Sequence, residues 1–307
     1  MTTTTTRVVG HDRAGLAGQL SDLGVERGGI LLVHASMRAV GPVSGGVRAA
    51  VGALRDALGG RGTLVVPSFT PENSDTSPQY LERASGLTDR ERAELRARMP
   101  PFDPATTPAP SMGRLSEAVR LTGGALRSAH PQTSFTALGP LAREVVGGHL
   151  PDCHLGEDSP LARLHELRAQ VLLLGTGFAT CTAFHLGEYR MPSPPRRRYR
   201  CVVRTGGRRR WWEYEDVALD DGDFAALGAD FAGSDGGAAV RTGPVGSSTS
   251  RLFRLPDAVD FASRWLPAHR TDGLARAAAP GRAAAPDGIA DPSPAGVHDR
   301  ALCRADG

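Results

Sequence analysis

Cysteine is scarce in this sequence, with four residues among 307. Cys153, Cys181, Cys201 and Cys303 show no paired spacing of the kind that holds a metal ion, and they are too few to cross-link so long a chain. These counts argue against a disulfide scaffold and a cysteine-based metal centre. A reduced protein of this kind is typical of the cytoplasm.

Long apolar runs are also missing. Residues 2–6 are a low-complexity lead of threonines, and the N-terminal MTTTTTRVVG lacks the apolar core of a signal peptide. No later segment approaches the roughly 18 uninterrupted apolar residues that a membrane span needs. The sequence therefore predicts a soluble, cytoplasmic protein without a membrane partner.

The net charge is small as well, at +3. A hairpin over residues 196–212 carries two arginine triplets and two tryptophans, which could act as stacking platforms, so a nucleic-acid-binding protein is one alternative. An acidic run follows this hairpin and would repel phosphate, and a charge of +3 is low for such a role. We therefore expect no nucleic-acid partner.

Short apolar runs predict the strands of a parallel layer. Residues 30–33 and 63–66 are continuous apolar or nearly apolar runs, and each suits a buried strand covered on both faces. Between them, the glycine-rich loop 34–46 leads into 47–58, where apolar residues recur at helical spacing. A strand, loop and helix in this order form half of a parallel α/β layer, in which ligands bind at the carboxyl ends of the strands.

The remaining segments predict one large domain with an insertion and a tail. Residues 71–110 shift to proline and charge around a helix at 88–99, and a long excursion of this kind is typical of a lid. An antiparallel hairpin at 199–214 indicates a mixed sheet. We expect one domain over 1–270 and a disordered tail over 271–307, because that tail is alanine, proline and glycine with few large apolar residues.

The best candidate for chemistry lies in residues 171–188, VLLLGTGFATCTAFHLGE. An apolar strand ends at two glycines, threonines can cap the helix that follows, and His185 and Glu188 share one face of that helix. A carboxylate there orients the imidazole and stabilises its protonated form, as a general base requires. The same spacing is more often an ordinary ion pair. Cys181, four residues before His185, leaves open a cysteine-dependent acyl transferase or hydrolase.

Several motifs taken together resemble the aminoglycoside 3-N-acetyltransferase family. They span residues 19–266 and occur in the family's order: LLVHASMRAVGPVSGG, GTLVVPSFT, FDPATTPAPSMGRLSEAVR, RSAHPQTSFTALGP, GEDSPLARLHELRAQVLLLGTGF and TAFHLGE. The excursion is similar to the longer form of actinomycete members. The resemblance implies a layered α/β sandwich with a mixed central sheet, distinct from the common GNAT acetyltransferase fold. It also implies transfer of acetyl from acetyl-CoA to the 3-amine of a 2-deoxystreptamine aminoglycoside, which confers antibiotic resistance.

The resemblance also implies which residues act on the antibiotic. His185 and Glu188 fall on the family's HLxE motif, whose histidine is the proposed base. Asp216 falls in the acidic antibiotic-binding segment, and a polycation needs carboxylates such as the neighbouring Glu213. Where some members have an acidic residue after PSFT, this chain offers two. The residues expected to bind the antibiotic are therefore Glu72 or Asp75, Glu213 and Asp216.

Acetyl-CoA is expected as a co-substrate, without a metal, where the family holds it. The positions are the first loop, the end of the second strand and the loop before residue 135. Arginines among them suit the phosphates of CoA because a guanidinium makes bidentate contacts. These residues are Ser36, Arg38, Val40, Gly41, Ser68, Arg127, Ser128 and Ser134. We expect an aminoglycoside and CoA as partners of a monomer or homodimer.

Overall fold

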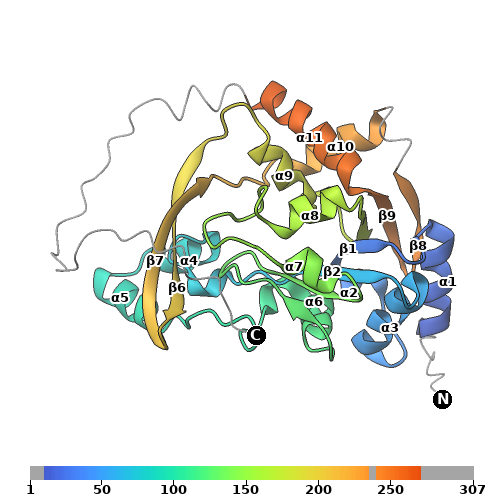
Figure 1. Ribbon diagram of the computed structural model, residues 1–307, viewed down its shortest axis with the longest axis horizontal. Coiled ribbons are helices and arrows are strands. Elements are labelled where there is room, and N and C mark those ends of the chain that lie inside the picture. The colour runs from blue at the N-terminus through green and yellow to red at the C-terminus, as the bar shows by residue number, and fades with distance from the viewer. Residues whose placement is uncertain (1–9, 235–239, 271–307) are drawn as a thin grey trace, which may run out of the picture.

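The computed structural model describes residues 10–234 and 240–270, shown in colour in Figure 1. The tail predicted at 271–307 and the low-complexity lead at the start lie outside the described residues. Within the described residues, no helix is both long and apolar enough to cross a membrane.

A seven-stranded mixed sheet forms the centre of the fold. Its three middle strands are parallel and buried along almost their whole length, as the continuous apolar runs predicted. Antiparallel strands flank them on both sides. In spatial order the strands are β3 (Leu126–Arg127), β4 (Phe135–Leu138), β2 (Thr63–Pro67), β1 (Ile30–Ala35), β5 (Gln170–Leu174), β9 (Ser248–Arg254) and β8 (Arg241–Val245).

Helices cover both faces of this sheet and make an α/β sandwich. Side chains alternate between the faces along a strand, so Leu31 and Val33 enter one core while Ile30 and Leu32 enter the other. The first core is covered by α1 (Arg13–Leu23), α3 (Gly46–Leu58) and α6 (Gly113–Arg120). The second is covered by α7 (Ala142–Val146), α8 (Pro160–Glu166), α9 (Ala183–Tyr189), α10 (Phe224–Gly233) and α11 (Leu255–His269).

The arginine hairpin is a separate two-stranded sheet, made of β6 (Arg196–Thr205) and β7 (Arg208–Val217). The expectation that this hairpin makes the central sheet mixed is therefore wrong, because β3, β4, β8 and β9 supply the antiparallel pairs. In Figure 1 the hairpin stands at one end of the molecule beside α4 (Pro78–Ala84) and α5 (Asp89–Ala97). Tyr80, Met99 and Val202 are buried between them, so the excursion 71–110 is folded against the hairpin.

Candidate active site

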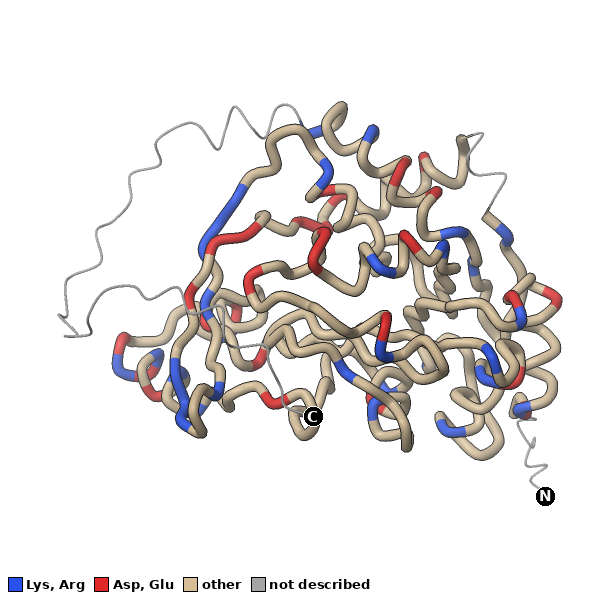
Figure 2. The backbone as a smooth tube through the Cα atoms, in the orientation of Figure 1, with Lys and Arg blue, Asp and Glu red and all other residues tan. Residues whose placement is uncertain are grey.

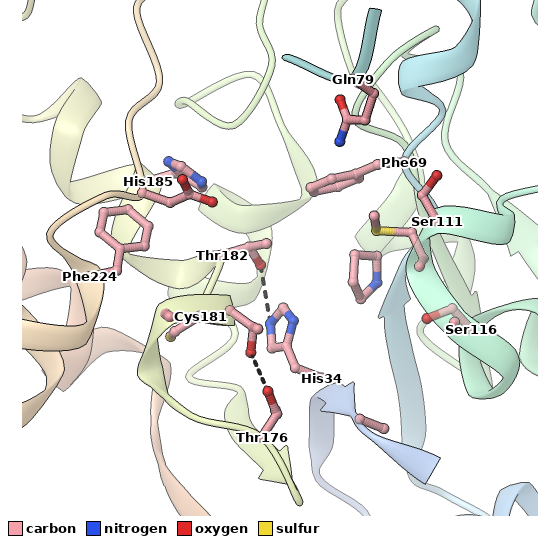
Figure 3. A pocket seen from close by; sticks show the side chains of 17 residues that line it. His34, Phe69, Gln79, Ser111, Ser116, Thr176, Cys181, Thr182, His185 and Phe224 are labelled. Atoms are coloured by element: carbon pink, nitrogen blue, oxygen red, sulfur yellow. Dashed lines mark hydrogen bonds between the residues drawn. The ribbon is translucent and has the colours of Figure 1, made fainter. Parts of the chain in front are cut away.

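A cavity of ≈ 430 Å³ opens where the parallel strands β1, β2 and β5 end. Parallel strands place their carboxyl ends at one edge of a sheet, where open α/β sheets bind ligands. The volume is within the range of small-molecule sites. In Figure 3, His185, Thr182 and His34 lie on one side of the cavity, and Phe69 and Ser111 lie across from them.

His185 and Glu188 form a close pair at this cavity. Both belong to α9, and Nδ1 of His185 lies 2.6 Å from Oε2 of Glu188. The Glu188 side chain is buried, whereas His185 lines the cavity. A hydrogen bond to a carboxylate places the proton on Nδ1, which leaves the lone pair of Nε2 to accept a proton. This is the arrangement that a histidine base requires.

A second histidine, His34 at the end of β1, lines the same cavity. Its Nε2 lies 3.2 Å from Oγ1 of Thr182, drawn as a dashed line in Figure 3. Burial, and secondarily the charge of His185, lowers the pKa of His34 to about 4, so this imidazole is neutral at pH 7. Thr182 precedes α9 but makes no side-chain cap, and its hydroxyl contacts His34 instead.

Cys181 has no exposed surface, and burial raises the pKa of its thiol to about 12. A thiol in this environment stays protonated at neutral pH, and only the thiolate is a strong nucleophile. Nδ1 of His185 is bonded to Glu188, so it is not directed at the sulfur. The geometry therefore disfavours the cysteine-dependent alternative.

The first loop predicted to bind acetyl-CoA borders the cavity. Ser36 caps the short helix α2 (Met37–Val40) through a 3.4 Å hydrogen bond from the backbone N–H of Ala39. Arg38 is exposed on this helix, whereas the Val40 side chain is buried in the core. Gly41 has a φ of 85°, and a Cβ there would lie 2.8 Å from Oγ of Ser247. Within this loop, the side chains of Ser36 and Arg38 keep exposed surface, and that they bind acetyl-CoA stays a prediction.

The second group predicted to bind acetyl-CoA is bonded internally, with the three serines buried and Arg127 half-buried. The Ser68 carbonyl accepts hydrogen bonds from Arg127 and from the Ser134 hydroxyl, and Arg127 also donates to Ser134 Oγ and to the Thr107 carbonyl. Burial is the main cause that lowers the pKa of Arg127, to about 10. Ser128 Oγ accepts from the Phe135 N–H. Ser68, Arg127 and Ser134 thus connect the end of β2 to β3 and to the start of β4, and Ser128 bonds β4. That these residues bind acetyl-CoA stays a prediction.

Asp216, which was expected to bind the antibiotic, is hydrogen-bonded within the protein. Its side chain is buried, and Oδ2 accepts hydrogen bonds from the His154 N–H at 2.7 Å and from the Tyr189 hydroxyl. Oδ1 accepts from the Val217 N–H at 2.7 Å. Burial raises its pKa. All of these contacts are internal, and that Asp216 binds the antibiotic stays a prediction.

The other three predicted carboxylates lie in different surroundings. Glu72 accepts a hydrogen bond from the hydroxyl of Ser111, which lines the cavity, so Glu72 lies beside the site. The Asp75 side chain is 8% exposed, and its Oδ2 lies 3.7 Å from Nη1 of Arg200. Glu213 is exposed on the hairpin and lies 3.6 Å from Arg198. Of the three, Glu72 is the one placed next to the cavity.

Several residues at the cavity escaped the sequence-based prediction. Asp221, in the exposed connection from β7 to α10, lines the cavity together with Gln79 of α4 and Ser116 of α6. Asp221 belongs to the acidic run that was expected to supply carboxylates for a polycation, although only Glu213 and Asp216 of that run were chosen as binding residues. Arg270 is bonded to Glu188, and the sequence carries no local signal for that contact.

Charged and aromatic side chains of the hairpin contact one another. Figure 2 shows the arginines of β6 beside the acidic stretch of β7, and Arg196 lies 3.0 Å from Glu215. The ring of Trp211 is covered by Arg200 and Arg209, whose guanidinium carbons lie 4.3 and 5.5 Å from its centroid. The stacking face of Trp211 is thus engaged by the protein itself.

A layered α/β fold with a histidine–glutamate pair at a cavity beside the strand ends is an arrangement typical of enzymes, and sequence comparison gives the family. The chain belongs to the aminoglycoside 3-N-acetyltransferase family, whose sequence profile matches residues 32–267. It is 38% identical over 268 residues to aminoglycoside N(3)-acetyltransferase VII of Streptomyces paromomycinus, covering 83% of this chain and 91% of that protein.

Solved structures agree with this membership. The YokD protein from Bacillus subtilis superposes with a TM-score of 0.78 at 32% identity, covering 85% of this chain and 95% of that one. The binary structure of AAC-IIIb with CoASH superposes with a TM-score of 0.72 at 30% identity, covering 84% and 96%. The chain is therefore an acetyltransferase of the antibiotic-modifying type, with the α/β sandwich expected from its sequence.

Proposed function

We propose that this chain transfers acetyl from acetyl-CoA to the 3-amino group of a 2-deoxystreptamine aminoglycoside, with His185 as the general base. The observation that carries the proposal is the 2.6 Å contact between His185 and the buried Glu188 at the cavity. Family membership supports the reaction, and the CoASH complex of AAC-IIIb supports the donor.

In this mechanism both substrates are bound together and the transfer is direct. Nε2 of His185 accepts a proton from the amine while the amine nitrogen attacks the thioester carbonyl carbon. The new N–C bond forms, the C–S bond breaks, and the thiolate of CoA leaves and is protonated. Glu188 stabilises the imidazolium that forms on His185.

Two carboxylates at the cavity suit a polycationic acceptor. Asp221 lines the cavity and Glu72 adjoins it through Ser111, so positive amines would meet negative charge there. Ser36 and Arg38, on the loop after β1, are the residues we propose for the CoA side. Guanidinium contacts to phosphate are commonly bidentate and charge-assisted.

A thiol-release assay with acetyl-CoA and a panel of deoxystreptamine antibiotics tests the proposal. We expect CoA release only with antibiotics that carry a free 3-amine, and NMR of the product should place the acetyl group on that nitrogen. Expression in a susceptible host should raise the inhibitory concentration, and a His185→Asn variant should not. No antibiotic-dependent release across the panel would refute the proposed function.

A further inference from the structure

Arg270, the last residue that the structure describes, contacts Glu188 of the His185–Glu188 pair. Arg270 follows the C-terminus of α11, and its Nη1 lies 2.5 Å from Oε1 of Glu188. Its Nε and Nη2 bond the two carboxylate oxygens of Asp223 at 2.7 and 2.5 Å, and Nη2 also donates to the Asp220 carbonyl at 2.6 Å. The Arg270 side chain is 17% exposed. A guanidinium bonded at every nitrogen has a fixed orientation.

Glu188 divides its two oxygens between His185 and Arg270. Oε2 bonds Nδ1 of His185, whereas Oε1 accepts from Arg270 and, at 3.0 Å, from the N–H of Asp220. Burial lowers the pKa of Arg270, but its hydrogen bonds to Asp223 and Glu188 outweigh burial and raise the pKa above the ordinary value. Arg270 is therefore positively charged at any working pH, next to the carboxylate that orients the base.

We propose that Arg270 is a positioning residue of this enzyme, which holds the Glu188 carboxylate against His185 and offsets part of its negative charge. The inference rests on the proposed role of His185 as general base. The proposal gives α11 a second role. The helix packs on the sheet, and Arg270 at its C-terminus places a positive charge beside Glu188. A pair that is held on both sides needs little reorganisation when the proton arrives.

The surrounding charges determine the sign of the expected effect. Asp221 lines the cavity with His185, and Asp223 lies behind Arg270. The pKa values of His34 and His154 are lowered, mainly by burial, so both imidazoles are neutral near pH 7. Removing the charge of Arg270 leaves the carboxylates of Glu188 and Asp223 without their shared cation. The imidazolium form of His185 then gains stability, and the base is lost to protonation at a higher pH.

Arg270→Gln should therefore move the acid limb of the kcat/KM profile upward by about half to one pH unit. It should also lower the plateau about tenfold, in line with the loss of other outer-shell partners. Arg270→Lys keeps the charge and should return the limb to the wild-type position, with a plateau still reduced because an ammonium lacks the guanidinium fork. Arg190→Gln is the matched control, since Arg190 follows the same helix α9 and pairs with Glu157 at 2.8 Å.

Asp223→Asn gives a test of opposite sign. This change removes a negative charge and leaves Arg270 in place, so the acid limb should move to lower pH. If the role of Arg270 is purely structural, Arg270→Gln and Asp223→Asn should both lower the melting temperature and the plateau of kcat/KM. Their acid limbs should then not move in opposite directions. Limbs of Arg270→Gln and Asp223→Asn that coincide with the wild type would overturn the inference.

A measurement without substrates separates this inference from the proposed function. In protein labelled with ¹⁵N-histidine, the His185 signals can be identified by their loss in His185→Asn. Their titration midpoint should rise in Arg270→Gln, fall in Asp223→Asn and stay unchanged in Arg190→Gln. If the wild type shows no acetyl transfer but these midpoints move as stated, the proposed function fails and the coupling stands. If the His185 titration midpoints stay unchanged in the variants of an active enzyme, the coupling between Arg270 and His185 is refuted and the proposed function stands.

Discussion

At the scale of single residues, the two nitrogens of His185 have different tasks, because Nδ1 is bonded to Glu188 and Nε2 is left for the substrate. His185→Asn should lower kcat by about a hundred- to ten-thousand-fold, since a general base typically contributes that much. Part of the activity should return at high pH as the free amine accumulates. Glu188→Gln should cost less, because it weakens imidazolium stabilisation and leaves the base in place.

Cys181→Ser is the matched control for that series. The thiol is buried and protonated, so this variant should keep most of its turnover, and initial-rate plots against both substrates should intersect. Parallel plots, or an acetylated Cys181 trapped by mass spectrometry without antibiotic, would contradict direct transfer.

Two aspartates five residues apart should respond differently to the same isosteric change. Asp221→Asn should raise the KM for the antibiotic much more than the KM for acetyl-CoA, because a polycation loses a charge-assisted partner at the cavity. Asp216→Asn should instead lower stability by about 1–3 kcal/mol, since an amide cannot accept all the hydrogen bonds that the buried carboxylate accepts. Steady-state kinetics and urea unfolding of both variants measure the contrast. A selective rise in antibiotic KM for Asp216→Asn would reverse our assignment.

The sequence contained the signal that separates such residues. Along β7, Glu213 and Glu215 are exposed whereas Tyr214 and Asp216 are buried, as the twofold period of a strand requires. Interpreting 213–216 as one acidic run hid this alternation. No comparable signal existed for the contact between Arg127 and Ser68, because these residues are 59 positions apart in the sequence.

At the scale of elements, apolar continuity predicted β1, β2 and β5 within one or two residues, and helical spacing predicted α3. Strands β8 and β9 were missed, because the glycine- and serine-rich segment 243–250 is typical of a loop. What makes them strands is pairing: Phe253 is buried opposite Val171 of β5, a contact between residues 82 positions apart. Non-local pairing of this kind overrides weak local preference.

The excursion and the hairpin share a small core that can be weakened on its own. Val202→Ala should remove buried volume between β6 and α4, and it should speed amide exchange in Pro78–Ala84 by about tenfold or more. Exchange in β1 and β5 should stay as in the wild type. Leu81→Ala is the control on the same helix, because Leu81 is exposed and should leave exchange unchanged. Equal acceleration across the central sheet would show that the small core is not a separate unit.

At the scale of the whole molecule, buried histidines should make the fold sensitive to acid. Burial lowers the pKa of His34 and of His149 to about 4, and it also lowers the pKa of His130 and of His154 well below the ordinary value. Unfolded chains bind these protons near pH 6.5, so between pH 6.5 and 4 the unfolded state holds more protons than the folded state. Stability should therefore be fully present above pH 6.5 and fall as the pH drops toward 4, by on the order of 3 kcal/mol for His149 alone.

Urea unfolding measured across this pH range tests the linkage. His149→Gln should be less stable than the wild type at pH 7.5, because His149 bonds Ser128 and two backbone carbonyls. Its free energy of unfolding should nevertheless depend less steeply on pH, because unfolding of the variant takes up at most about one proton fewer than unfolding of the wild type. Curves for the two proteins that run parallel between pH 6.5 and 4 would mean that His149 does not contribute to the acid sensitivity.

The position of Arg270 gives the sharpest prediction about how much of the chain catalysis needs. Residues 271–307 are mainly alanine, proline and glycine, so a chain that ends at Arg270 should keep its melting temperature and its activity. A chain that ends one residue earlier, at His269, should fold to nearly the same melting temperature but lose about tenfold in rate, because Glu188 loses its cation. Calorimetry and initial rates of the two truncated chains make the comparison. Equal activity of the two chains would refute a catalytic contribution from Arg270, whereas a large loss in both would show that residues beyond it take part.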